Sequence, residues 1–218
     1  MHILSVGDSW SAGVWDIVDG KHVVTEPGYK NELSTIGEVT NIWGFSNSQA
    51  LDTIIKYHDN YDIVLFFVTD PFRDISDYEK NYSFYVNNLN TADELLAVHS
   101  SLLESTIQAS RRFGDKVKLI GGCQTLVHRN DENIIIHSVS ELVSQNHFRH
   151  PLLWDSGWGG ILNKNANKDL FKLWAKNREL QDSMESEYFQ KYFWPDGYHP
   201  NAYSNKILGK ELVRILTS

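Results

Sequence analysis

The sequence predicts an α/β domain in which helices wrap a parallel sheet. Short, apolar, β-rich runs alternate along the chain with longer segments whose apolar residues recur at three- and four-residue spacing. The run at 62–69 is almost continuously apolar, as in a central parallel strand that is buried on both faces. A length of 218 residues favours a single domain over 1–218.

The individual elements follow from these patterns. Strands are expected at 2–6, 38–43, 62–69 and 116–122, and residues 133–139 form a weaker candidate strand. We expect a helix directly after the turn at residues 7–9, a second at 46–57 and a third at 91–113, where Thr91 and Glu94 form a capping box. A last helix follows Pro200. The irregular stretches 71–90 and 123–166 are predicted to be either lids or binding loops, or else plain surface insertions.

Composition excludes several classes of protein. The net charge is −8, and the 20 lysines and arginines are scattered apart from Arg111–Arg112, so we expect no nucleic-acid partner. The single cysteine, Cys123, excludes an internal disulfide. With no signal peptide and no long apolar stretch, we expect no membrane partner and a cytoplasmic location, or a place in a phage particle assembled there. The oligomeric state stays open.

Ser9 lies where an open parallel sheet places its binding crevice, after the carboxyl end of the first strand. Taken alone, this serine is best explained as a helix cap. A nucleophilic serine requires a base, and His199 is the best candidate, three residues after Asp196. At that spacing the carboxylate can orient one imidazole nitrogen while the other faces the serine.

These residues carry a family resemblance. "VGDSWSAG" (6–13), "NIWGFSNSQALDTI" (41–54) and "DGYHPNA" (196–202) resemble the SGNH, or GDSL, hydrolases, in order and over nearly the whole chain. The resemblance implies a three-layer α/β/α sandwich of the flavodoxin-like type, with about five parallel strands. It also implies Ser9 as the nucleophile, His199 as the general base and then acid, and Asp196 as the orienting group, with no metal and no organic cofactor.

The same resemblance implies an oxyanion hole built from the backbone N–H groups of Ser9 and Gly44. The family's third block normally supplies another donor from an asparagine, and this sequence departs there. It reads "FFVTDPFRD" (66–74), so that Thr69 and Asp70 stand in place of the Asn-Asp pair. The Thr69 hydroxyl and the Asn47 amide are the two candidate third donors. Arg73 is expected either to pair with an acid such as Asp70 or to bind an anionic substrate group. In the second case Asp70 is also a candidate substrate-binding residue.

The predicted function is that of a serine esterase acting on a small-molecule or carbohydrate ester, such as a sugar O-acetyl group. Trp154, Trp158 and Tyr198 line a sugar or acyl pocket in this interpretation, and are core residues in the alternative. A second hypothesis is an inactive binding or structural module, for carbohydrate recognition or a phage particle. A third, a flavodoxin-like nucleotide binder, has only the Gly7 loop in its favour, since the chain lacks a Gly-rich phosphate motif.

Overall fold

The structure is a computed structural model that describes residues 1–74, 92–122, 126, 131–144, 187–193 and 199–218. Its centre is a five-stranded sheet in which every pairing is parallel, with the strand order β4-β1-β5-β6-β7. The strands are β1 (His2–Gly7), β4 (Glu38–Trp43), β5 (Ile63–Val68), β6 (Val117–Gly121) and β7 (Ile134–Ile136). This confirms the predicted parallel sheet of about five strands.

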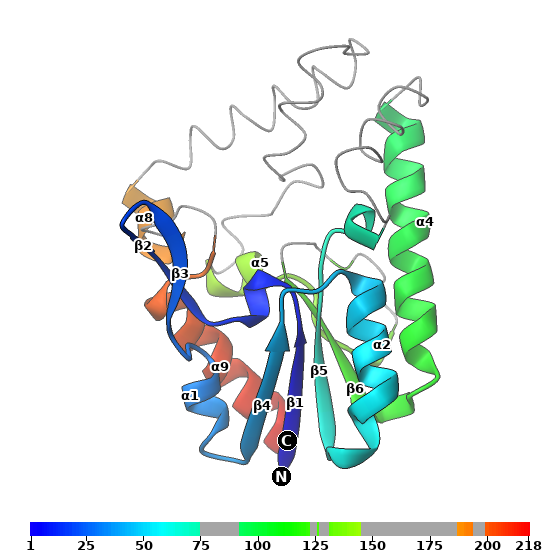
Figure 1. Cartoon of the computed structure of the whole chain (residues 1–218), viewed down its shortest axis with the longest axis horizontal. Coiled ribbons are helices and arrows are strands. Elements are labelled where there is room, and N and C mark those ends of the chain that lie inside the picture. Colours follow the sequence, from blue (N-terminus) through cyan, green and yellow to red (C-terminus); the bar gives the residue numbers. More distant parts are fainter. Residues whose placement is uncertain (75–91, 123–125, 127–130, 145–186, 194–198) are drawn as a thin grey trace.

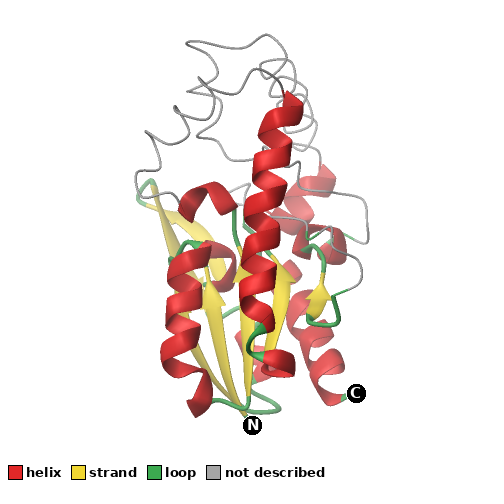
Figure 2. Ribbon diagram, turned by 90° about the vertical axis from the view of Figure 1, so that its right-hand side faces the viewer, coloured by secondary structure: helices red, strands yellow, loops and turns green. Residues whose placement is uncertain are grey.

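Helices cover both faces of the sheet and give the molecule three layers (Figures 1 and 2). The helices are α1 (Lys30–Leu33), α2 (Asn47–Tyr57), α4 (Ala92–Arg111), α5 (Val139–Val143), α8 (Glu187–Phe193) and α9 (Ala202–Thr217). Alternate strand side chains enter two separate cores: one set packs with α1, α5, α8 and α9 (Ile3, Leu65, Phe67), and the other with α2 and α4 (Leu4, Val64, Phe66). Both faces are therefore buried, which explains the apolar run at 62–69.

The strand order places the candidate site. Counting only the strands of the sheet, the order is 2-1-3-4-5, that of flavodoxin-like folds, and ligands in such sheets bind beyond the carboxyl ends of the strands at the point where the order reverses. Gly7, the last residue of β1, pairs with Trp43 of β4 on one side and with Phe67 of β5 on the other. The loops that follow these three strands therefore meet at one edge of the sheet.

The segment after β1 differs from the prediction. Instead of a helix, Ser9–Ser11 form one short 3-10 turn (η1), and the chain continues into an antiparallel hairpin of β2 (Val14–Val18) and β3 (Lys21–Glu26). Asp19 and Gly20 form the connecting turn, with φ of 51° and 73°. Asp-Gly is the favoured pair for a two-residue hairpin turn because both positions need positive φ. The Asp-Gly turn thus favours a hairpin at this position, where a helix usually follows the first strand.

The other predicted elements correspond closely to the observed ones. The helix predicted at 46–57 is α2, which Ser46 and Gln49 begin with a reciprocal capping box. The helix predicted at 91–113 is α4, although Thr91 lies outside the described residues. The stretch 123–166 contains β7 and α5, so part of it belongs to the sheet and its covering layer. Among the described residues, no helix is both long and apolar enough to cross a membrane.

Candidate active site

Ser9 is presented by a tight turn directly after β1. A Cβ atom on Gly7 would lie only 2.6 Å from the Phe67 carbonyl oxygen, so only glycine allows β1 to run this close to β5 here. The Asp8 carboxylate then accepts a hydrogen bond from the Trp10 backbone N–H at 2.9 Å and begins the turn. These contacts leave the Ser9 side chain half-buried at the edge of the sheet.

His199 meets Ser9 from the other end of the chain. Its Nε2 atom lies 2.7 Å from the Ser9 Oγ atom, although the two residues are 190 positions apart. Asn201 caps α9 by accepting a hydrogen bond from the Ser204 N–H at 3.1 Å, which fixes the backbone just beyond His199. This serine–imidazole distance is within the range for proton transfer from a nucleophile to its base. Asp196, the predicted orienting acid, lies outside the described residues.

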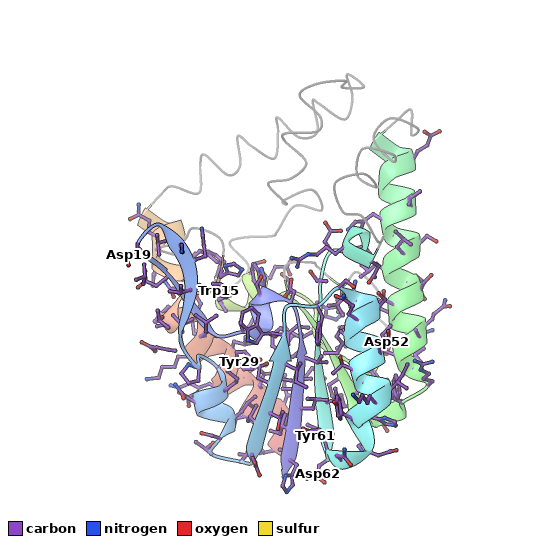
Figure 3. All side chains as sticks on the ribbon, viewed as in Figure 1. Trp15, Asp19, Tyr29, Asp52, Tyr61 and Asp62 are labelled. Carbon is purple, nitrogen blue, oxygen red and sulfur yellow. The ribbon has the colours of Figure 1, made fainter. Side chains whose placement is uncertain are left out.

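Aromatic side chains surround the imidazole of His199. The Trp15 ring stacks on it, with 4.6 Å between ring centroids and 21° between ring planes, and Trp10 lies at 6.3 Å in a tilted arrangement. Trp15 also donates from Nε1 to the Ser9 carbonyl oxygen at 2.8 Å. Trp43 contacts the Trp15 ring edge-on at 5.7 Å. Trp15, which Figure 3 shows on the hairpin, was not predicted as a site residue, because this segment was expected to be a helix.

Two backbone N–H groups are available beside the serine. Gly44 follows β4 with φ of +95°, a conformation that favours glycine, and the next N–H, from Phe45, donates to the Gly7 carbonyl at 3.1 Å. This hydrogen bond holds the Gly44 turn against the end of β1. Among the residues that the structure describes, the N–H groups of Ser9 and Gly44 donate to no acceptor. They are the two donors that the sequence predicted for an oxyanion hole.

The two candidate third donors have other partners. The Thr69 hydroxyl donates to the Asp8 carboxylate at 2.6 Å. The Asn47 amide forms two hydrogen bonds with the Thr69 backbone, donating to its carbonyl at 3.0 Å and accepting from its N–H at 2.9 Å. All three side chains are almost completely buried. Their hydrogen bonds join the ends of β1 and β5 to the start of α2, and so fix these three segments relative to one another.

Arg73 pairs with Asp8 rather than with Asp70. Its Nη1 atom lies 3.3 Å from the Asp8 carboxylate, whose side chain is 2% exposed, and 3.1 Å from the Thr69 hydroxyl oxygen. The Arg73 side chain is 40% exposed. Asp70 instead lies in the interior, 3.9 Å from the His99 Nε2 atom of α4. The acid that faces Arg73 is therefore Asp8, the neighbour of Ser9 in the sequence, and not the Asp70 named in the prediction.

A second hydrogen-bond network, which the sequence did not reveal, lies beneath the turn. Tyr29 donates its phenol proton to the Ser11 carbonyl at 2.9 Å and lies 2.6 Å from the Ser5 hydroxyl. Complete burial raises the pKa of Tyr29 well above its ordinary value. Asn205 of α9 accepts from the Tyr29 N–H at 3.2 Å and donates to the Pro200 carbonyl at 2.7 Å. This network connects the Ser9 turn to the chain beside His199.

The remaining predicted residues are not placed: Trp154, Trp158 and Tyr198 lie, like Asp196, outside the described residues. No protein-family model matches the chain, and no curated protein matches it as a relative.

Proposed function

We propose that the protein is a serine hydrolase that cleaves carboxylic esters through an acyl-enzyme on Ser9. The observation that carries the proposal is the 2.7 Å contact between the Ser9 Oγ and His199 Nε2 atoms. A neutral serine is a poor nucleophile, and an imidazole at this distance supplies the base that it requires. The two residues are at opposite ends of the chain, and they meet where α/β sheets place their active sites.

The chemistry then follows in two halves. His199 takes the Ser9 proton as Oγ attacks the ester carbonyl carbon, and the negative oxygen of the tetrahedral intermediate accepts hydrogen bonds from the N–H groups of Ser9 and Gly44. His199 returns the proton to the departing alcohol, leaving Ser9 acylated. A water that His199 activates in the same way releases the acid. Asp196 has the proposed role of orienting the imidazole, on the strength of its place in the motif.

By the family resemblance, the substrate is a small carboxylic ester, with a carbohydrate O-acetyl group as a leading candidate. No metal or organic cofactor has a role in the proposed steps. Substrate preference is tested by hydrolysis of a series of p-nitrophenyl esters from C2 upward. A rate that falls as the acyl chain lengthens is expected if the acyl group is small.

The decisive experiment is labelling with a fluorophosphonate probe, followed by peptide mass spectrometry. We expect the label on Ser9 in the wild type, and none in Ser9→Ala. We expect ester hydrolysis to fall by about 10⁴-fold or more in Ser9→Ala and in His199→Ala. Ser101→Ala, which removes an exposed hydroxyl on α4, is the matched control and keeps full activity.

One observation favours a second candidate, an inactive binding module with this fold. The two candidate third donors already have acceptors, because the Thr69 hydroxyl donates to Asp8 and the Asn47 amide donates to the Thr69 carbonyl. Loss of one oxyanion donor costs on the order of 3 kcal/mol of transition-state stabilisation. A folded wild-type protein that the probe leaves unlabelled, and that hydrolyses esters no faster than Ser9→Ala, would refute the hydrolase and favour this second candidate.

A further inference from the structure

The Trp15 side chain contacts both members of the Ser9–His199 pair. Its indole N–H donates to the Ser9 carbonyl at 2.8 Å, and its ring lies face to face with the His199 imidazole at 4.6 Å and 21°. The Ser9 carbonyl also accepts from the Ala12 N–H within the 3-10 turn. The indole therefore restrains Ser9, together with the Ala12 N–H, and it also restrains the His199 ring directly.

The hairpin fixes Trp15 in this position. The β2–β3 pairing shifts its register between Val14 and Trp15, and such a bulge re-aims the side chains beside it. The Trp15 ring also meets Trp43 edge-on, at 81°. The indole cannot turn away from this position without breaking its two ring contacts, with His199 and Trp43, and its hydrogen bond to Ser9.

The stack matters most when the imidazole is charged. His199 gains a positive charge as it takes the Ser9 proton, and the face of an indole attracts cations more strongly than that of any other side chain. A neutral imidazole gains little from this electrostatic attraction. The contact is therefore stronger in the transition state than in the resting enzyme, which is the condition for an interaction to accelerate a reaction.

We propose that Trp15 is a positioning residue for the base: it holds the His199 ring with Nε2 towards Ser9, and it stabilises the charge that the ring acquires. This inference rests on the proposed function and adds a residue to it. Trp10 does not fill the same role, because its ring is tilted by 56° at 6.3 Å from the imidazole. It packs in the core with Phe193 instead.

The test compares Trp15→Phe with Trp15→Leu, using p-nitrophenyl acetate and the purified full-length protein. Phenylalanine keeps an aromatic face for the imidazole, and leucine fills space without one. We expect Trp15→Leu to lower kcat by about tenfold with KM changed less than about twofold, and Trp15→Phe to stay within about threefold of the wild type. Ile17→Ala, an exposed position on the same strand, is the control for a general effect of altering the hairpin.

Several results would overturn the proposed role of Trp15. Equal kcat losses in the Phe and Leu variants, a change confined to KM, or a Trp15→Leu variant as active as the wild type would overturn the inference. Thermal unfolding verifies that each variant is folded, and Trp15→Met replaces Trp15→Leu if the leucine variant is not. A wild type no faster than Ser9→Ala refutes the proposed function, and this inference with it. An active wild type matched by Trp15→Leu refutes only the role of Trp15.

Discussion

The Tyr29 phenol can be removed without changing the shape of the core, which makes its contribution measurable. Tyr29→Phe deletes two hydrogen bonds, to the Ser5 hydroxyl at 2.6 Å and to the Ser11 carbonyl at 2.9 Å. Tyr29 and Ser5 are completely buried, and so is the Ser11 residue in the turn that carries Ser9. Because water cannot replace the missing hydroxyl, both partner groups stay unsatisfied. We expect a loss of about 2–4 kcal/mol in the free energy of unfolding.

Urea unfolding at pH 7 measures this loss as a lower midpoint with an unchanged m-value. Tyr203→Phe is the matched control, because Tyr203 is 49% exposed, and we expect it to change stability by less than about 0.5 kcal/mol. In a double-mutant cycle, Ser5→Ala should add little to Tyr29→Phe, since it removes one of the groups left unsatisfied. A Tyr29→Phe variant within about 0.5 kcal/mol of the wild type would refute the argument.

The pH dependence of stability supplies an independent measurement. Burial raises the pKa of Tyr29 in the folded protein, whereas in the unfolded chain tyrosine titrates near its ordinary pKa of about 10. The folded state therefore keeps a proton that the unfolded state loses above about pH 10. This contribution to stability is fully present below about pH 10, and it falls by up to about 1.4 kcal/mol for each pH unit above that. Tyr29→Phe should lack this part of the decline, and parallel curves for the two proteins between pH 9 and 11 would contradict the prediction.

Two further predictions concern the residues that hold the site together. Asn205→Ala removes a buried amide that bonds to Pro200 and to Tyr29, so we expect thermal unfolding to show a loss of about 2–4 kcal/mol; an unchanged unfolding temperature would show that these hydrogen bonds contribute nothing. Thr69→Val removes the hydroxyl that donates to Asp8, so we expect about 1–3 kcal/mol less stability but a kcat within about threefold of the wild type. A kcat loss of about 100-fold at unchanged stability would instead identify the Thr69 hydroxyl as an oxyanion donor.

Sequence patterns were sufficient to predict the sheet, because a strand that is buried on both faces has a nearly continuous run of apolar residues. The apolar run at 62–69 became β5, which ends one residue earlier at Val68. The hairpin was missed, even though "VWDIVDGKHVV" (14–24) holds β-branched and aromatic residues on both sides of an Asp-Gly pair, which is a favoured hairpin turn. The expectation of a strand-to-helix succession had outweighed that local signal.

The candidate site likewise contains residues that the sequence predicted and contacts that it did not. Ser9 and His199 were found because each lies in a short motif of recognisable composition. The contacts of Tyr29 and Asn205 could not be found from local patterns, because the two residues are 176 positions apart and each looks ordinary in its own segment. The Trp15–His199 stack depends on a bulge and on the path of a hairpin. Such tertiary contacts leave no periodic signal in one sequence.

The network around Asp8 gives Thr69 and Arg73 a structural role beside Ser9. A carboxylate that is 2% exposed and adjacent to the nucleophile is stable only if its charge is paired and hydrogen-bonded. Thr69 and Arg73, which stand four positions apart on the chain, supply a hydroxyl donor and a positive charge to the same carboxylate oxygen. In the proposed mechanism, an unpaired Asp8 would oppose the negative charge that forms on the substrate beside Ser9. Thr69 and Arg73 are thus the partners of Asp8, and the proposed mechanism leaves the oxyanion to the backbone N–H groups of Ser9 and Gly44.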